Sequence, residues 1–175
     1  MIVTVGGLSG SGKTTIAKGL AKVLGLRYVS AGELFRKIAR ERHMPLDELS
    51  KKLEERFDKE IDAFVRREAR KGNVVIDSRL AAFFVKRAFK IFVRTDLKAR
   101  AKRVAKRDGL PLSKALKYVK DRDKYDRRRY RKLYGIDLFD LSPYHLIIDN
   151  THFTYADTRD KLPKYIAEMV RLWKG

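Results

Sequence analysis

One stretch near the start of the chain decides the fold: Gly7-Leu8-Ser9-Gly10-Ser11-Gly12-Lys13-Thr14-Thr15. As far as Thr14 it matches the pattern G-x-x-x-x-G-K-[ST] at every fixed position, directly after a predicted strand and directly before a predicted helix. Glycines let the backbone turn tightly and point successive N–H groups inward, and the following helix adds the positive end of its dipole. All nine residues are therefore predicted to bind ATP, in what we call the phosphate loop (residues 7–15).

The side chains at the end of the phosphate loop have separate predicted roles. Lys13 can reach the β- and γ-phosphates as a catalytic point charge, and the hydroxyl of Thr14 is placed to ligate Mg²⁺. Thr15 is expected to be a structural neighbour that touches the α-phosphate. The alternative is that the stretch is only a tight strand-to-helix connection, but such a turn would not require a lysine and a threonine. We therefore expect ATP and Mg²⁺ as cofactors.

The rest of the chain alternates short β-branched runs with longer helical stretches, which is typical of βαβ units in a parallel sheet. Strands are predicted at residues 2–5, 27–29, 73–76, 90–93 and 145–148. Helices are predicted at residues 13–24, 32–42, 45–70, 96–107, 113–133 and 155–173. The expected fold is α/β, with a five-stranded parallel sheet flanked by helices in a single domain over residues 1–175.

Composition narrows the classes of partner. The chain has 42 Lys and Arg against 22 Asp and Glu, a formal charge of +20, which attracts nucleic acid and phosphorylated metabolites alike. It has no cysteine, and its three histidines are far apart in sequence, so we expect neither disulfides nor a zinc site. The start has no basic leader, and no apolar run approaches the ~20 residues of a membrane span, so we expect a cytoplasmic protein that does not bind a membrane.

Two further segments are predicted to bind a phosphoryl acceptor. Ser30 closes the second strand and opens a helix that carries Arg36 one turn further on, at the carboxyl edge of the sheet where ligands of α/β proteins bind. Asp77 and Arg79 follow the third strand at the same edge, and a guanidinium suits bidentate capture of a phosphate. Arg36 could instead lie on a solvated helix face. Asp77 could bond to the acceptor nucleoside, orient Mg²⁺ through water or cap a helix.

A basic helix supplies a further group. On the predicted helix 113–133, Arg122, Asp126 and Arg129 are spaced i, i+4 and i+7 and therefore share one face, which can meet a ligand. The alternative is a solvated helix with internal ion pairs. Weaker candidates for recognition of the two bases are Arg103, Arg107 and residues 150–152 on the adenine side, and Asp58, Asp62 and Arg66 on the acceptor side.

The chain resembles the archaeal-type cytidylate kinases along nearly its whole length, most specifically at residues 2–15, 29–36, 72–81 and 129–137. The resemblance implies a P-loop nucleoside monophosphate kinase that uses Mg-ATP to phosphorylate CMP and dCMP. It implies a monophosphate-binding insert at about residues 31–70 and a lid at about residues 108–135. It also assigns Arg122 and Arg129 to the transferring phosphates and Asp126 to the vicinity of the acceptor. We expect a monomer.

The chain departs from the family pattern after the third strand. Ser78 stands where many members have glycine, and Ala82-Phe83-Phe84 replaces a Gly-Trp pair, so the choice of acceptor stays open. The nearest alternative is a kinase for AMP or UMP. From another class, the alternative is an RNA-binding NTPase, because Tyr125, Tyr130 and Tyr134 lie among the basic residues of the lid. No RNA-binding motif with stacking aromatics accompanies them, so nucleic acid is not the expected partner.

Overall fold

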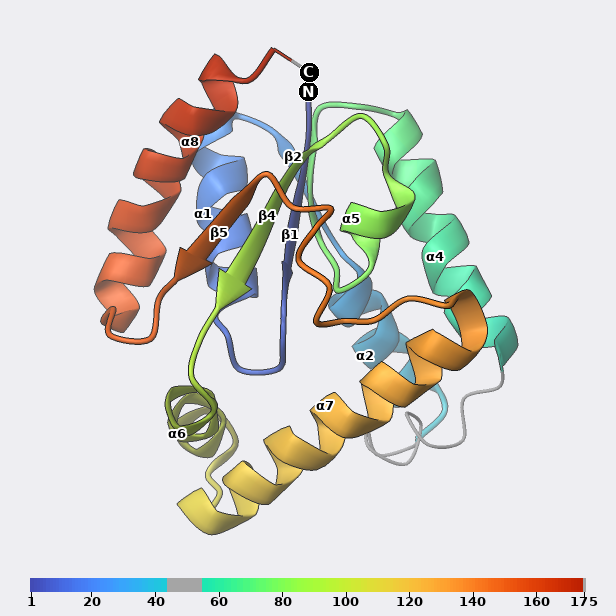
Figure 1. The fold of residues 1–175 in the computed structure, drawn as a ribbon, viewed down its shortest axis with the longest axis vertical. Coiled ribbons are helices and arrows are strands. Elements are labelled where there is room, and N and C mark those ends of the chain that lie inside the picture. Colours follow the sequence, from blue (N-terminus) through green and yellow to red (C-terminus); the bar gives the residue numbers. More distant parts are fainter. Residues whose placement is uncertain (44–54, 175) are drawn as a thin grey trace.

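The computed structural model describes residues 1–43 and 55–174, and it contains the predicted five-stranded sheet (Figure 1). The strands are β1 (Ile2–Gly7), β2 (Arg27–Ser30), β3 (Val74–Asp77), β4 (Phe89–Arg94) and β5 (Leu146–Asp149). All neighbouring strands pair in parallel, in the order β2-β3-β1-β4-β5. Their carboxyl ends therefore lie at one edge of the sheet, and the phosphate loop leaves β1 at that edge.

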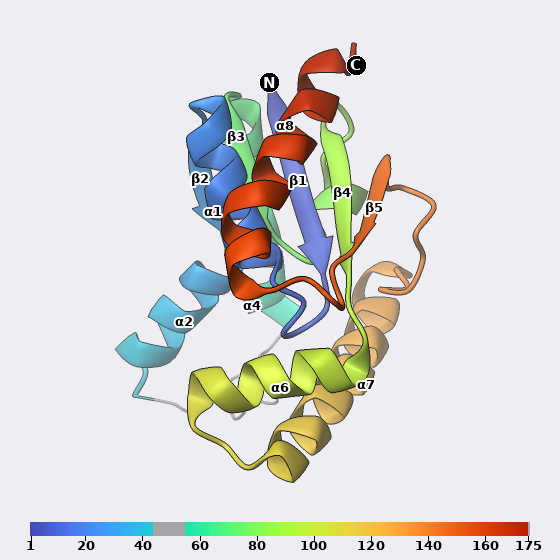
Figure 2. The ribbon, with the colours of Figure 1, turned by 90° about the vertical axis from the view of Figure 1, so that its left-hand side faces the viewer.

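The helices form two layers around the sheet. They are α1 (Lys13–Leu24), α2 (Ala31–Glu41), α4 (Glu55–Arg70), α5 (Ala81–Phe84), α6 (Leu97–Asp108), α7 (Leu112–Tyr134), the π-helical turn η1 (Asp157–Lys161) and α8 (Leu162–Leu172). Figures 1 and 2 show α1 and α8 on one face of the sheet and α4 and α5 on the other, with α6 and α7 crossing beyond the carboxyl ends of the strands. Both chain ends lie at the opposite edge. Within the described residues, no helix has the length and apolar character to cross a bilayer.

The core explains why this sheet forms. Val3 and Val5 of β1 have no exposed surface and pack with Ile16 and Leu20 of α1 and Ile166 of α8. A second cluster on the other face joins β3 to α4 and α5. Because both faces of the central strands are covered, these strands are continuous apolar runs rather than alternating ones. Each buried Val, Ile or Leu side chain contributes about 1.5–3 kcal/mol, which makes the base of the phosphate loop rigid.

Two details differ from the predicted elements, and one predicted helix is described only in part. The last helix is interrupted by η1, because Pro163 has no N–H to donate to the preceding turn and the backbone widens before α8 begins. The helix α5 was not predicted, since four residues are too few to show a helical period. Of the helix predicted at residues 45–70, the part from Glu55 onward is α4, and the earlier part lies outside the described residues.

Candidate active site

The conformation of the phosphate loop depends on glycine at two positions. Gly10 and Gly12 have φ angles of 78° and 86°, in the left-handed region that other residues rarely adopt. A Cβ on Gly10 would also lie 2.7 Å from the carbonyl oxygen of Arg100 in α6. The loop can therefore bend around a phosphate while α6 packs directly against its outer side.

The loop is held by its Ser11 carbonyl oxygen, which accepts three hydrogen bonds. The donors are Thr95 Oγ1 (3.1 Å), Asn150 Nδ2 (2.9 Å) and a guanidinium nitrogen of Arg103 (3.1 Å). In a trans peptide the carbonyl and the next N–H point in opposite directions, so these bonds turn the N–H of Gly12 away from the three donors. The side chain of Ser11 is itself buried, so its predicted part in ATP binding rests on the backbone.

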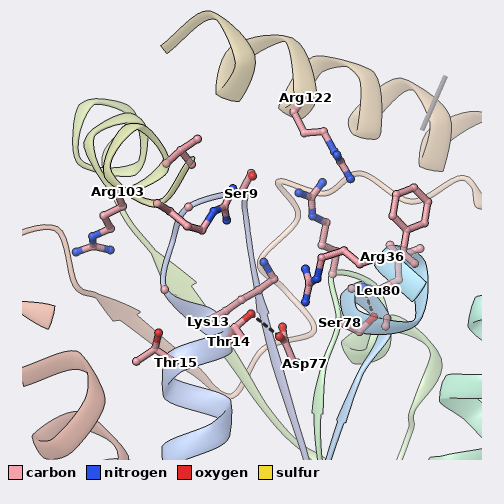
Figure 3. A pocket seen from close by; sticks show the side chains of 18 of the residues that line it. Ser9, Lys13, Thr14, Thr15, Arg36, Asp77, Ser78, Leu80, Arg103 and Arg122 are labelled. Atoms are coloured by element: carbon pink, nitrogen blue, oxygen red, sulfur yellow. Dashed lines mark hydrogen bonds between the residues drawn. The ribbon is translucent and has the colours of Figure 1, made fainter. Parts of the chain in front are cut away.

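A cavity of about 970 Å³ opens in front of the phosphate loop and brings most of the predicted site residues together (Figure 3). The predicted residues that line it are Ser9, Gly10, Gly12, Lys13, Thr14, Thr15, Arg36, Asp77, Arg79, Arg122 and Arg129. Figure 3 shows Lys13, Arg36 and Arg122 directed into this space from three different elements. Five predicted residues are not in its lining: Gly7, Leu8, Ser11, Ser30 and Asp126.

Positive charge is concentrated around Lys13. The pKa of Lys13 is lowered from 10.5 to about 8, chiefly by burial and also by repulsion from Arg79, Arg122 and Arg36, while Asp77 opposes the change. Burial also lowers the pKa of Arg79 to about 10, with Arg122 as the next cause. Cations whose pKa is lowered by burial and by each other are stabilised when an anion enters. The electrostatics of this part of the cavity therefore favour a polyanionic ligand such as a phosphate chain.

Asp77 lies beside Thr14 at the base of the cavity. Its Oδ2 accepts hydrogen bonds from Thr14 Oγ1 (2.5 Å), Tyr28 Oη (3.3 Å) and Ser30 Oγ (3.4 Å). The side chain is 3% exposed, and among the described residues no donor bonds to its buried Oδ1. Hydroxyl and carboxylate oxygens are the ligands that Mg²⁺ accepts, directly or through its waters. The pair Thr14 and Asp77 therefore fits the predicted metal position.

Ser30, predicted to bind the acceptor, has a structural role in the described chain. Its Oγ accepts a hydrogen bond from the backbone N–H of Glu33 (3.1 Å), which makes it the N-cap of α2, and it also donates to Asp77. Its hydroxyl proton is thereby used in a hydrogen bond within the protein. The residue is not part of the cavity lining. Ser30 fixes the start of α2, the helix that carries Arg36.

Asp126 also lies outside the lining of the cavity. It has no exposed surface, it forms an ion pair with Arg79, and its Oδ2 lies 3.2 Å from Arg122 Nε. One buried carboxylate thus holds an arginine from the end of β3 and another from α7. The predicted helical face is present, but its aspartate orients the arginines that line the cavity.

A connection between α6 and α7 was not predicted from the sequence. Arg100, which is 5% exposed, donates from one nitrogen to Asp123 Oδ2 (2.7 Å) and to the Ser9 carbonyl oxygen (3.2 Å). The pair therefore links the phosphate loop to the lid helix. The available signal was that Asp123 lies i−3 from Asp126, on the same side of a strongly basic helix.

Some of the weaker candidates for base recognition line the cavity and others do not. On the acceptor side, Asp58 and Asp62 line the cavity, whereas Arg66 stacks on the ring of Phe84 (4.4 Å from its centroid) and does not. On the adenine side, Arg103 and Arg107 line the cavity. Residue 150, also expected there, is instead a buried asparagine that holds the phosphate loop, and His152 is exposed.

Comparison with known proteins identifies the family of the chain. The model of the cytidylate kinase-like family matches residues 2–71 and 57–152. A cytidylate kinase of Methanopyrus kandleri is 39% identical over 171 residues, which cover 90% of this chain and 89% of that one. A cytidylate kinase of Pyrococcus horikoshii is 43% identical over 157 residues, with coverage of 88% and 82%.

The solved structures support the fold. A shikimate kinase from Acinetobacter baumannii, solved in complex with shikimate, superimposes with a TM-score of 0.62 at 18% identity, and the match covers 99% of this chain and 95% of that one. At that identity the likeness concerns the arrangement of strands and helices alone. The match to the family model and the two curated relatives go further: this chain belongs to the cytidylate kinase-like family.

Proposed function

We propose that this protein transfers the γ-phosphoryl group of Mg-ATP to CMP, and also to dCMP. The observation that carries the proposal is that one cavity holds two phosphate-binding groups: the phosphate loop with Lys13, and a cluster of Arg36, Arg79 and Arg122 from separate elements. A hydrolase needs the first group alone, whereas a kinase with a phosphorylated acceptor needs both. The family membership and the names of the relatives support CMP as that acceptor.

The proposed reaction joins an oxygen of the acceptor phosphate to the γ-phosphorus of ATP while the bond from that phosphorus to the β-phosphate oxygen breaks, and ADP leaves. Such a transfer requires alignment and positive charge more than covalent help from the protein. Lys13 would contact the β- and γ-phosphates, and Arg79 with Arg36 would hold the acceptor phosphate. Arg122 and Arg129 would stabilise charge on the transferring group. Mg²⁺ beside Thr14 and Asp77 would neutralise phosphate charge when bound.

The lid arginines have enough electrostatic strength for this role. One cation about 4 Å from one phosphate charge contributes about 4 kcal/mol at an effective dielectric constant near 20. The pair on α7 could therefore supply a large part of the rate, and closure of the lid (about residues 108–135) over the insert (about residues 31–70) would exclude water and limit hydrolysis of ATP. We further propose that the protein acts as a monomer in the cytoplasm; the described residues of one chain supply both phosphate-binding groups.

A coupled assay that detects ADP tests the proposal. Purified protein is given ATP, Mg²⁺ and, in parallel, CMP, dCMP, UMP, AMP or a structured RNA. The expected result is turnover with CMP and dCMP at kcat/KM well above that with UMP or AMP. Turnover with AMP or UMP as the preferred substrate would move the assignment to another monophosphate kinase. Turnover stimulated by RNA and unaffected by CMP would favour the RNA-binding NTPase.

A further inference from the structure

The outer side of the lid helix α7 carries an exposed row of basic side chains. We call it the basic row: Lys117, Lys120, Lys124 and Arg128. Their spacing of three and four residues keeps them along one side of the helix for about 17 Å. All four are exposed and outside the cavity lining, whereas the four buried residues of α7 lie on the other side of the helix. Figures 1 and 2 show α7 crossing beyond the carboxyl ends of the strands, so the basic row faces away from the sheet.

Positive and negative charges are separated between the two sides of α7. Of its three aspartates, Asp123 and Asp126 are buried and pair with arginines of the site, so Asp121 is the one exposed acid of this helix. Within the described residues, no member of the basic row forms an ion pair. The two i, i+4 steps from Lys120 to Arg128 bring like charges together, which destabilises a helix. The basic row therefore weakens α7 unless an anion from outside neutralises it.

Elsewhere the same chain neutralises exposed basic residues. Ion pairs along η1 and α8 join Lys161 to Asp157, Arg159 to Asp160 and Arg171 to Glu168. These elements show how a solvated surface of this chain is arranged, with both signs of charge interspersed. The high charge of the whole chain therefore does not account for the basic row, whereas a ligand with repeated negative charges does.

Two lysines of α6 extend this surface. Lys98 and Lys102 are exposed, are spaced i and i+4, and form no ion pair within the part of the chain that the structure describes. Helix α6 packs against α7 through an apolar cluster that includes Val104 and Val119. The pair of helices thus presents six exposed cations that no described carboxylate neutralises.

We propose that the basic row, together with Lys98 and Lys102, binds the phosphate backbone of a nucleic acid strand. Cations about 5–6 Å apart along a straight helix suit a chain of phosphates, and such contacts do not read the base sequence. Binding to a bilayer surface would also use apolar side chains, and the described residues of α7 expose one large apolar side chain, Leu112 at the first position of the helix. The inference goes beyond the proposed transfer to CMP and does not depend on it. It adds a partner that the sequence motifs did not predict.

A strand bound to the basic row would lie on the back of the lid and leave the cavity open to nucleotides. The arginines of α7 that line the cavity are Arg122 and Arg129, and the basic row shares no residue with that lining. Nucleic acid and ATP should therefore bind at the same time. Six contacts with a single strand correspond to a slope of about −4 when the logarithm of the binding constant is plotted against that of the salt concentration.

The test measures, by fluorescence anisotropy, the binding of labelled oligouridylate and oligothymidylate of about 20 nucleotides at about 50 to 200 mM salt. The row variant combines Lys117→Glu, Lys120→Glu, Lys124→Glu and Arg128→Glu. The control variant combines Lys86→Glu, Arg87→Glu, Lys164→Glu and Lys174→Glu, which reverse exposed basic residues in other parts of the chain and change the formal charge by the same amount.

The wild-type protein should bind both strands with similar affinity. The row variant should bind them at least about 100-fold more weakly at about 100 mM salt, with a slope closer to zero by about 3. The control variant should stay within about 5-fold of the wild type, because charges far from the strand are screened. Mg-ATP with CMP should not displace the strand from the wild type.

Several outcomes would overturn this inference. Equal losses of affinity in the row and control variants would mean that the overall charge binds the strand. Displacement of the strand by Mg-ATP with CMP would place it in the cavity. Binding of the wild type to phosphatidylserine vesicles but not to either oligonucleotide would identify a membrane surface instead. Thermal unfolding shows whether the variants are folded; should the row variant not be, the same four positions changed to glutamine make the measurement, and wild-type affinity in that variant also overturns the inference.

Discussion

Binding of ATP is expected to draw a proton onto Lys13 at slightly alkaline pH. The pKa of Lys13 is lowered to about 8 in the protein without ligand, so at pH 8 about half of the molecules carry a neutral amine there. A phosphate charge about 4 Å away would stabilise the ammonium by about 4 kcal/mol at a dielectric constant near 20. Since one pKa unit corresponds to about 1.4 kcal/mol, the pKa of Lys13 should return to its ordinary range when ATP is bound.

The sign and size of the proton uptake follow from these pKa values. The free form loses its proton as pH rises through about 8, whereas the bound form keeps it to about pH 10. Uptake per ATP should therefore be about 0.1 proton at pH 7, about 0.5 at pH 8 and about 0.9 at pH 9. Arg79, whose pKa is about 10, stays almost fully charged up to pH 8 and adds at most about 0.1 proton at pH 9.

Calorimetry measures this uptake directly. Mg-ATP is titrated into the protein in pairs of buffers that have the same pH but different enthalpies of ionisation, and the slope of binding enthalpy against buffer enthalpy gives the number of protons exchanged. Lys13→Arg is the control, because its side chain stays charged and its slope should be near zero at pH 8. An equal slope in the two proteins at pH 8, or no rise in the wild-type slope from pH 7 to pH 9, would refute the assignment of Lys13 to the phosphates.

Three further predictions concern single carboxylates and arginines of the site. Asp77→Asn weakens the group beside Thr14, so the Mg²⁺ concentration for half-maximal turnover should rise about 10- to 100-fold; an unchanged magnesium titration would remove Asp77 from the metal position. Arg79→Ala should raise the KM for CMP and lower kcat, and unfolding in urea should show a loss of about 3 kcal/mol, because buried Asp126 loses a partner; normal saturation by CMP would mean that the acceptor phosphate binds elsewhere. The raised pKa of Asp62 means that this residue binds more protons in the folded than in the unfolded chain between pH 4 and 6, so it lowers the stability of the fold as pH rises through that window. Asp62→Asn should therefore raise the free energy of unfolding at pH 7 by up to about 3 kcal/mol and change it little at pH 3; equal free energies of unfolding for the two proteins at pH 7 would contradict the raised pKa.

The parts of the site that were predictable from sequence are those made by adjacent residues. The phosphate loop has a local pattern, and the end of a parallel strand has a known place at the sheet edge, so Arg79 and Arg36 could be expected near it. Strand and helix limits followed from hydrophobic period and from glycine stops. These signals depend on residues within a few positions of each other.

The parts that were missed depend on contacts between distant elements. The carbonyl of Ser11 is held by donors 84, 92 and 139 residues away, and no local sequence pattern predicts these contacts. The helical spacing placed Asp126 on the correct face, but sequence could not show that Arg79 would reach the same carboxylate from another element and bury it. Ser30 shows the converse case, because a serine before a helix is first an N-cap, and that local role takes up its hydroxyl.

The charges inside the cavity, rather than the net charge of the whole chain, are expected to determine which ligand binds. Among the residues that the structure describes, eight lysines and arginines and four aspartates line the cavity, so this lining remains positive although Asp58 and Asp77 lie against its cations. Charges on the exposed surface are screened within about 8 Å at physiological salt, whereas buried ones are screened much less. Binding of a nucleotide in this cavity should therefore depend on salt far less steeply than binding of RNA to the exposed basic surface would. The buried arginines, rather than the formal charge of +20, are what suit this chain to a small phosphorylated ligand.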